Sequence, residues 1–329
     1  ARVRRPREVV AVRTPSRSGL LVTADDFQKV VFFELHKPVP GSARFSVFGT
    51  AGSVSAVMSL SDQAAPFVCD WEGDGDQDLL VGGGYGWPRI VLNEGDDKRP
   101  AFSEARLIMS ESTPIRLIRN EVLGPPDCWH NMGYPFPAYA DWDGDGLHDL
   151  ILPNETNRIF WYRNIGTRHE PEFGPQQQVI VDGYPDSPEL RTATAQLVAA
   201  HPHVYPEDEH QPFHWRSGAG FADFNADGLL DMVAKEWSKY SLGLFLRCRD
   251  EAGALRLKRT GVLRTIAGAQ FHGTRANVVD WDSDGLLDIV YSRATNDTAA
   301  DTIFLARNVG TNPEPQFEDE RPLRFFGEP

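Results

Sequence analysis

A nine-residue acidic pattern occurs four times in this chain and constrains its fold more than any other feature. It places oxygen-bearing side chains at positions 1, 3, 5 and 9 and glycine at position 6, and a short apolar run follows each copy. The copies span residues 70–78, 141–149, 223–231 and 280–288, here named loops 1 to 4. One copy could be an ordinary Asp-Gly hairpin turn. Four copies in one chain predict a repeat architecture.

The chemistry of the pattern indicates a site for a hard cation. Carboxylates spaced by two residues point into one concave loop, and the glycine permits the sharp turn, as in calcium loops of the EF-hand kind. Crowded carboxylates repel one another by roughly 1 kcal/mol per pair in water, and a cation relieves this repulsion. Because every ligand is an oxygen, Ca²⁺ fits best, and we expect up to four ions. The expected ligands are Asp70, Glu72, Asp74, Asp78, Asp141, Asp143, Asp145, Asp149, Asp223, Asn225, Asp227, Asp231, Asp280, Asp282, Asp284 and Asp288.

The net charge is explained largely by these loops. The chain of 329 residues carries a formal charge of -14 at pH 7, and four Ca²⁺ ions would supply eight positive charges. Nucleic acid is therefore not an expected partner. No run of about 18 apolar residues occurs, so no membrane span is predicted. Millimolar extracellular calcium suits such loops, which favours a secreted or extracellular (or periplasmic) protein.

A second repeated phrase accompanies three of the acidic loops. Asn93-Glu94-Gly95, Asn164-Ile165-Gly166 and Asn308-Val309-Gly310 each lead to a Pro-x-Phe phrase a few residues later. Asn-x-Gly closes a hairpin, and Pro-x-Phe opens the next strand. The unit becomes four antiparallel strands, which is a β-propeller blade, and the chain is expected to be an all-β, single-domain propeller.

Five blades can be located in the sequence. They cover roughly residues 8–50, 64–110, 136–181, 217–262 and 275–326, and the first lacks an acidic loop. Residues 111–135 and 182–216 are too short for four strands and are interpreted as insertions. Aromatic residues at the second loop position (Trp71, Trp142, Phe224 and Trp281) are expected to wedge between blades. Cys69 and Cys248 lie in strand-like runs and are expected to be buried free thiols.

The four acidic loops resemble those of the FG-GAP or VCBS repeat family, the integrin-α-like β-propellers, over nearly the whole chain. The resemblance implies a calcium-binding propeller. Propellers of this family usually close with seven blades, so five blades imply either a five-bladed ring or two blades outside this sequence.

The two insertions both enter innermost strands of the expected propeller, at the end opposite the acidic loops. They should therefore build a site over the central channel. Six of the nine histidines lie in these insertions or at the entry to the last blade, beside aromatic and basic residues. Aromatic platforms and positive donors suit an anionic polysaccharide or glycan.

Three interpretations of these histidines stay open. They are ordinary loop residues, or His201 and His203 with His210 or His214 hold a structural Zn²⁺ ion, or they are catalytic. The catalytic interpretation draws on the resemblance, because several calcium-containing propellers of this kind are polysaccharide lyases acting on ulvan or rhamnose-glucuronate polymers.

A lyase of this kind acts by β-elimination from a uronate. A base removes the C5 proton, a cation neutralises the carboxylate, and an acid protonates the leaving oxygen. The residues expected to take these roles are His130 and His214 as base and acid, Tyr134 or Tyr205 as alternative acid, and Arg216, Arg275 and Lys235 as carboxylate neutralisers.

Two other functions compete with the lyase hypothesis. Glycoside hydrolysis would need inward carboxylates, for which Glu207, Asp208, Glu209 and Glu236 are the candidates. The alternative of a different class is a non-catalytic propeller, lectin-like or adhesive, which binds a carbohydrate or protein. Near-equivalent pockets between blades would favour binding, and one asymmetric pocket would favour an enzyme. The protein is expected to be a monomer.

Overall fold

The structure is a computed structural model of the chain. It describes residues 6–13, 18–24, 27–39, 42–50, 64–96, 98–118, 133–156, 158–184, 212–214, 217–236, 241–273, 275–293 and 303–323, and isolated positions between 187 and 200. Every statement below concerns these residues.

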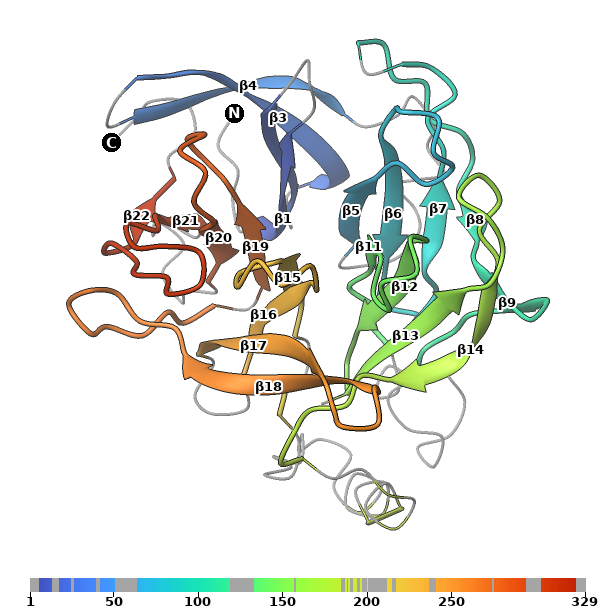
Figure 1. Cartoon of the computed structure of the whole chain (residues 1–329). Coiled ribbons are helices and arrows are strands. Elements are labelled where there is room, and N and C mark those ends of the chain that lie inside the picture. Colours follow the sequence, from blue (N-terminus) through green and yellow to red (C-terminus); the bar gives the residue numbers. More distant parts are fainter. Residues whose placement is uncertain are drawn as a thin grey trace.

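The described residues form five antiparallel sheets arranged as the blades of a β-propeller (Figure 1), so the expected fold is confirmed. Blade 1 contains β1 (Pro6–Arg13), β2 (Ser18–Ala24), β3 (Phe27–Val39) and β4 (Ser42–Thr50). Blade 2 contains β5 (Ala65–Cys69), β6 (Asp78–Gly82), β7 (Arg89–Val91) and β8 (Arg106–Leu107). Blade 3 contains β11 (Ala138–Ala140), β12 (Asp149–Pro153), β13 (Ile159–Asn164) and β14 (Phe173–Gln178). Blade 4 contains β15 (Ala219–Ala222), β16 (Asp231–Lys235), β17 (Leu242–Arg249) and β18 (Leu255–Val262), and blade 5 contains β19 (Arg275–Val279), β20 (Asp288–Ser292), β21 (Ile303–Ala306) and β22 (Arg321–Pro322).

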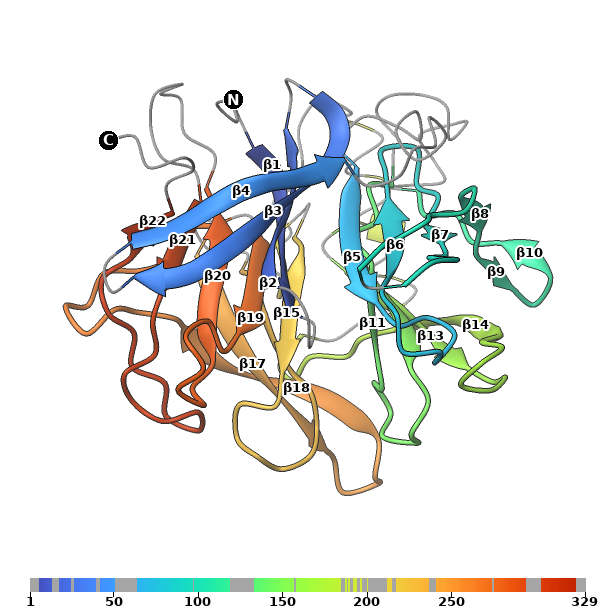
Figure 2. The ribbon, with the colours of Figure 1, turned by 90° about the horizontal axis from the view of Figure 1, so that it is seen from above.

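The strand patterns explain the orientation of the blades. The second strands β6, β12, β16 and β20 are buried at all five of their positions, as expected of strands covered on both faces by neighbouring blades. The first strand of each blade lies nearest the axis. β1 contacts both β5 of blade 2 and β19 of blade 5, and β15 contacts β19. The acidic loops join first strands to second strands, so all four lie at one end of the ring (Figure 2).

Five hydrophobic clusters fill the junctions between neighbouring blades and close the ring. The junction of blades 5 and 1 joins Val9 and Leu20 to Val290 and Leu305. A side-chain hydrogen bond of 2.7 Å from Asn277 to the Val9 carbonyl links the same two blades. First and last blades therefore meet directly, which makes a five-bladed ring.

The aromatic residues at the second loop position lie in these junctions, as predicted. Trp71 stacks on Tyr139 of the next blade, with ring centroids 4.6 Å apart, and Trp142 meets Phe221 edge-on at 5.9 Å. Phe224 is fully buried between blades 4 and 5, and Trp281 packs against the cluster between blades 5 and 1.

In blades 2, 3 and 4, the segment that follows the outer strand pairs with the outer edge of the next blade. Parallel bridges join Ser110 to Phe173, Val181 to Leu257, and Thr265 to Phe317. In each pair the first residue follows the outer strand of one blade, and the second lies in the outer strand or edge of the next. This arrangement covers sheet edges that would otherwise stay open.

Blade 3 carries an extension that the sequence pattern did not indicate. β9 (Met109–Ser110) and β10 (Thr113–Pro114) form a hairpin that enlarges its sheet to six strands, in the order β10-β9-β14-β13-β12-β11. Residues just after the outer strand of blade 2 thus belong to the sheet of blade 3.

Two smaller observations complete the fold. Cys69 is a buried free thiol as expected, whereas Cys248 is only partly buried and lies one residue from the end of β17, a strand whose earlier residues are mostly buried. None of the described residues forms a helix long and apolar enough to cross a membrane.

Candidate functional site

The ninth residue of each acidic loop is a fully buried aspartate that ties the loop to its blade. Asp78, Asp149, Asp231 and Asp288 have no exposed surface. One carboxylate oxygen of each accepts a hydrogen bond from the backbone N–H of the second loop residue, and the other accepts one from a residue at the end of the third strand or just after it. These aspartates therefore have a structural function in addition to any function as ligands.

The turn of each loop follows the geometry that its glycine predicts. Gly75, Gly146, Gly228 and Gly285 at position 6 have φ between +84° and +97°, in the left-handed region. In loops 2, 3 and 4 the aspartate at position 1 accepts hydrogen bonds from the backbone N–H groups of positions 5 and 6. The carboxylates therefore face the inside of the turn.

Two of the four loops bring three carboxylates together closely enough to share one cation. Oxygens of Asp141, Asp143 and Asp149 lie within 4.8 Å of one another, and so do oxygens of Asp280, Asp282 and Asp288. An all-oxygen set of three carboxylates suits Ca²⁺ or a similar hard cation. The prediction of oxygen-ligand metal sites is supported in this coarser form, for an ion of unspecified identity.

Burial shifts the acid–base behaviour of the anchoring aspartates. Desolvation raises the pKa of Asp149 to about 7, against the opposing effect of the hydrogen bond from Asn164, and it raises the pKa of Asp288 to about 6. The pKa of Asp143 is also raised, first by burial and then by the charge of Asp145. The cost of ionising these groups together is what a bound cation would remove.

Arginine side chains lie against the acidic loops. Arg163 contacts Asp143 through Nε at 2.7 Å and Asp145 through Nη2 at 2.8 Å. Burial alone would raise the pKa of Asp145, but hydrogen bonds from Leu147 and Arg163 outweigh it and lower that pKa.

Blade 5 repeats this contact, because Arg307 contacts both Asp282 and Asp284. Neighbouring blades supply further arginines: Arg168 of blade 3 lies 3.0 Å from Asp70 of loop 1, and Arg249 of blade 4 donates to the Asp143 carbonyl at 2.9 Å.

Four of the seven predicted catalytic residues lie at the end of the ring opposite the acidic loops. Lys235 ends β16 and Arg275 begins β19; the backbone N–H of His214 donates to the Lys235 carbonyl at 3.0 Å. The Arg275 guanidinium lies 3.9 Å from the centroid of the Phe136 ring, two residues beyond Tyr134. The structure thus brings these four segments to one end. His214, Lys235 and Tyr134 are buried there, with 3% to 5% of their surface exposed.

Tyr134 has an unusual backbone conformation, with φ of +39°. Bulky residues rarely adopt positive φ, and such strain is concentrated at sites that the surrounding structure holds in place. His130, Tyr205 and Arg216 lie outside the described residues, as do His201, His203 and His210 of the predicted zinc site and the hydrolysis candidates Glu207, Asp208 and Glu209. Glu236 is described; it is buried and forms a two-point ion pair with Arg259, at 2.8 and 2.7 Å.

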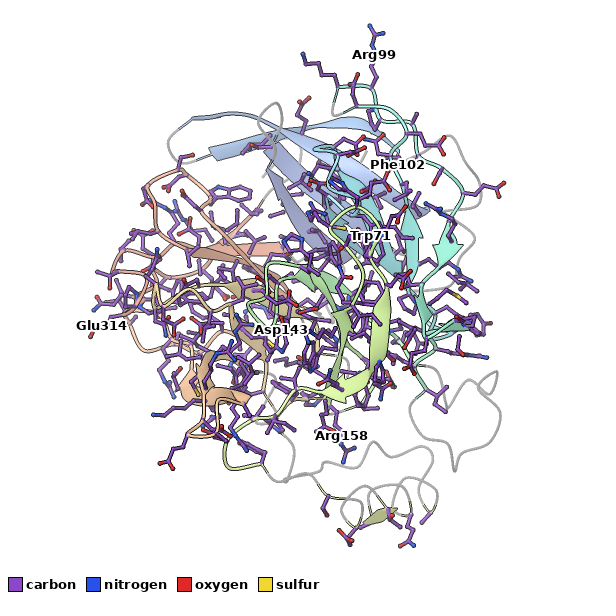
Figure 3. The ribbon with its side chains drawn as sticks, turned by 45° about the vertical axis from the view of Figure 1, so that its right-hand side comes forward. Trp71, Arg99, Phe102, Asp143, Arg158 and Glu314 are labelled. Carbon is purple, nitrogen blue, oxygen red and sulfur yellow. The ribbon has the colours of Figure 1, made fainter. Side chains whose placement is uncertain are left out.

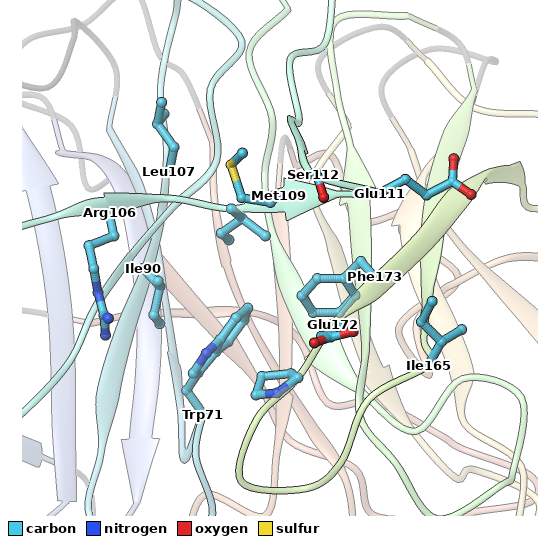
Figure 4. A pocket seen from close by; sticks show the side chains of 12 residues that line it. Trp71, Ile90, Arg106, Leu107, Met109, Glu111, Ser112, Ile165, Glu172 and Phe173 are labelled. Carbon is cyan, nitrogen blue, oxygen red and sulfur yellow. The ribbon is translucent and has the colours of Figure 1, made fainter.

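A pocket of about 580 Å³ lies between blades 2 and 3 (Figure 4). Its buried floor consists of Trp71, Ile90, Ile108 and Phe173, and the Trp71 and Phe173 rings lie 5.6 Å apart between their centroids. Its rim carries the exposed residues Arg106, Leu107, Met109, Glu111, Ser112, Ile165 and Glu172, together with Pro171. Arg106 lies at one end, and Glu111 and Ile165 lie at the other.

The pocket exists because of the hairpin that extends blade 3. Glu111 and Ser112 form its two-residue turn, with φ of +47° and +69°, and Glu111 donates its backbone N–H to the Phe173 carbonyl at 3.1 Å. A turn lies at the corresponding place between blades 4 and 5, where Arg264 and Gln270 form an antiparallel bridge and Ile266 donates its backbone N–H to the Phe317 carbonyl at 2.8 Å, but it adds no named strands to the sheet of blade 5. Trp71 also links the pocket to loop 1. In Figure 3, Trp71 and Asp143 appear near the middle of the view, whereas Arg99 and Glu314 appear at its margins.

Sequence reasoning missed this pocket. It assigned Trp71 to the core, which the structure confirms, but it did not connect that ring to residues 106–112. The available signal was weak: a run of Arg, Leu, Met and Glu directly after a predicted outer strand, with no turn-forming Asn or Gly at residues 111 and 112.

Comparisons with known proteins add little to these observations. No protein-family model and no curated protein sequence matches the chain. Among solved structures, the chain is similar to a lectin from Agrocybe aegerita that is described as recognising non-reducing terminal N-acetylglucosamine. The TM-score is 0.39 at 14% sequence identity, over 95% of this chain and 65% of the length of that lectin. A likeness this weak supports no argument about function, and the FG-GAP or VCBS resemblance stays a prediction.

Proposed function

We propose that this chain is a secreted, calcium-stabilised β-propeller of the FG-GAP or VCBS kind that binds a glycan without cleaving it. The observation that carries the proposal is the pocket between blades 2 and 3, with aromatic rings at its floor and charged groups at its rim. A single asymmetric pocket was expected of an enzyme, but this one lies between two blades and none of the predicted catalytic residues that the structure describes lines it, so it supports binding. Two carboxylate clusters at the acidic-loop end support the calcium component.

The lining of the pocket suits the amphipathic surface of a sugar. A pyranose ring has an apolar C–H face, for which the exposed side chains of Leu107, Met109 and Ile165 offer apolar surface above the buried rings of Trp71 and Phe173. Its hydroxyls donate hydrogen bonds well to carboxylates, and Glu111 and Glu172 stand at the rim. A volume of about 580 Å³ lies within the range of small-molecule sites in proteins.

The charges of the rim favour a neutral glycan over an anionic one at this pocket. Two carboxylates, Glu111 and Glu172, oppose the single guanidinium of Arg106. Arg106 also faces Glu72 of loop 1: burial raises the pKa of the Glu72 carboxyl, and the charge of Arg106 opposes only part of that rise. A uronate would therefore be repelled more than attracted here. An anionic chain would suit the basic residues at the opposite end of the ring better.

A polysaccharide lyase is the second candidate. The placement of Tyr134, His214, Lys235 and Arg275 at one end of the ring favours it among enzyme classes. The burial of His214, Lys235 and Tyr134 counts against it, because a base and an acid must reach the sugar.

Glycan binding can be tested with neutral and uronate-containing oligosaccharides on the whole chain by calorimetry. The proposal predicts binding of neutral sugars, weakened at least fivefold by Glu172→Gln. That variant preserves the fold, because Gln316 occupies the same position in blade 5 and donates its backbone N–H to Asn308 just as Glu172 does to Asn164. Glu314→Gln, at an exposed position of blade 5, is the control.

The outcomes separate the two candidates. If neither neutral nor uronate-containing oligosaccharides bound, or if Glu172→Gln bound them as tightly as the wild type, the proposal that this pocket binds a glycan would be wrong. Absorbance near 235 nm, where unsaturated uronate products absorb, would rise with uronate polymers if the protein were a lyase.

A further inference from the structure

The same arginine contact occurs in two acidic loops that are far apart in the sequence. Arg163 and Arg307 each stand directly before an Asn-x-Gly turn, and each reaches the carboxylates at positions 3 and 5 of the acidic loop of its own blade. The recurrence of one geometry in two blades makes a chance surface contact a poor explanation. In blades 2 and 4 the corresponding residues are Leu92 and Leu246.

The two loops that receive this contact from an arginine of their own blade are also the two loops in which three carboxylates converge. Loop 2 brings together Asp141, Asp143 and Asp149, and loop 4 brings together Asp280, Asp282 and Asp288. The carboxylate at position 3 belongs both to the cluster and to the arginine contact. A bound cation and the guanidinium therefore compete for the same carboxylate, and the two positive charges repel each other.

The arginines are free enough to leave. The Arg163 side chain keeps 47% of its surface exposed, so its guanidinium can turn into water at low cost. The Arg307 side chain keeps 27% exposed and its Nε is buried, so its release costs more. Asp149 and Asp288, in contrast, are fixed by backbone hydrogen bonds and cannot turn away.

We propose that Arg163 and Arg307 are resident counter-ions of loops 2 and 4, which a bound divalent cation must displace from the carboxylates at positions 3 and 5. Each arginine stabilises the loop without an ion and lowers its affinity for one. The inference rests on the calcium component of the proposed function and is independent of the glycan pocket.

Terbium luminescence on the full chain can test this competition. Tb³⁺ takes the same oxygen ligands as Ca²⁺, and an excited indole at the second loop position transfers energy to a bound ion. Trp142 serves loop 2 and Trp281 serves loop 4, so Trp142→Phe and Trp281→Phe assign the signal to its loop; Phe224 already occupies that position in loop 3.

Arg163→Leu and Arg307→Leu introduce the residue that blades 2 and 4 already carry. Each variant should tighten Tb³⁺ binding at its own loop by roughly three- to tenfold, because the ion no longer has to break the two partly exposed ion pairs that the arginine makes with the loop. The melting temperature of the ion-free variant should fall. Arg163→Lys, which keeps the charge but loses the forked contact, should lie between Leu and the wild type.

Arg249→Leu is the matched control for loop 2. It removes the same charge from the same loop, but Arg249 donates to the Asp143 carbonyl and not to a carboxylate. It should change Tb³⁺ affinity less than twofold. The proposal is overturned if Arg163→Leu changes affinity no more than Arg249→Leu does, if it weakens binding, or if neither the wild type nor the Leu variant binds Tb³⁺ at loop 2.

Discussion

Asp149 accepts a hydrogen bond of 2.7 Å from the backbone N–H of Asn164, fifteen residues further along the chain. Asn164 in turn uses its side-chain oxygen to accept backbone hydrogen bonds from Gly166 and Glu172. The acidic loop, the third strand and the following turn are thereby joined by two side chains. Asp78 with Asn93 and Asp288 with Asn308 repeat the arrangement.

This relationship predicts that the buried aspartate matters for stability even without a metal ion. Asp78→Ala should destabilise the ion-free protein by about 2–4 kcal/mol, because it leaves the backbone N–H groups of Trp71 and Asn93 buried without acceptors. Glu94→Ala, one residue from Asn93 but exposed, should stay within about 0.5 kcal/mol. Urea unfolding in EDTA measures both, and equal effects of the two variants would refute the anchoring role.

The raised pKa values predict how the ion-free protein responds to pH. With a folded pKa of about 7 for Asp149, well above its unfolded value, the folded chain keeps a proton that the unfolded chain has lost. Stability should therefore fall as pH rises between about 4 and 7, by an amount on the order of a few kcal/mol, and change little below that window.

Unfolding in urea with EDTA at pH 5, 6, 7 and 8 measures this slope. Asp149→Asn should be less stable, yet should show a flatter dependence on pH, since the titrating group is gone. Saturating calcium should remove most of the slope in the wild type, because the ion favours the ionised carboxylates. Greater stability at pH 8 than at pH 5 without calcium would show that the folded chain does not hold the extra proton.

The sequence predicted the repeated parts of this molecule and not the parts that cross between repeats. The five blades, the positive φ at Gly146 and the wedging of Trp71 all follow from local patterns, because strand alternation and turn chemistry act over a few residues. The contact of Arg163 with Asp143 spans a whole hairpin. The sequence shows the repeated Arg-Asn-x-Gly phrase, but no local pattern predicts which acidic side chains the arginine contacts.

The pocket was unpredictable for a related reason. Its lining comes from loop 1, from the segment around Met109 and from the turn before Phe173, which meet only when two blades pack. The hairpin at Glu111 and Ser112 contains neither Asn nor Gly, although both residues adopt positive φ. Tertiary pairing with β14 imposes this turn against local preference.

Removing divalent ions should destabilise the protein if the acidic loops bind them. A ligand that binds only the folded state contributes about 1.4 kcal/mol per site at ten times its Kd and about 2.7 kcal/mol at a hundred times. Calorimetric melting in 10 mM CaCl₂ should therefore give a clearly higher Tm than melting in EDTA. Mg²⁺ at equal ionic strength should give less, since it demands a stricter geometry. An identical Tm in calcium and in EDTA would count against occupied loops.

A last prediction concerns the fourth position of the loops. Gly73 and Gly144 occupy it in loops 1 and 2 with φ of +71° and +79°, but Ala226 and Ser283 hold the same left-handed conformation at +57° and +67°. The left-handed conformation costs a residue with a Cβ atom roughly 1–2 kcal/mol in the folded state. Replacement by glycine recovers only part of this free energy, because glycine has more conformational freedom to lose from the unfolded chain.

Ala226→Gly and Ser283→Gly should accordingly each raise the free energy of unfolding by about 0.5–1 kcal/mol. The reverse change, Gly144→Ala, should lower it by a similar amount. An added Cβ at Gly144 would meet only Arg249 Nη2, at an ordinary 3.6 Å, so backbone strain and not crowding would cause the loss. Urea unfolding of the three variants measures the effect. If Ala226→Gly were destabilising while Gly144→Ala was neutral, the left-handed turn would not be the conformation these loops adopt.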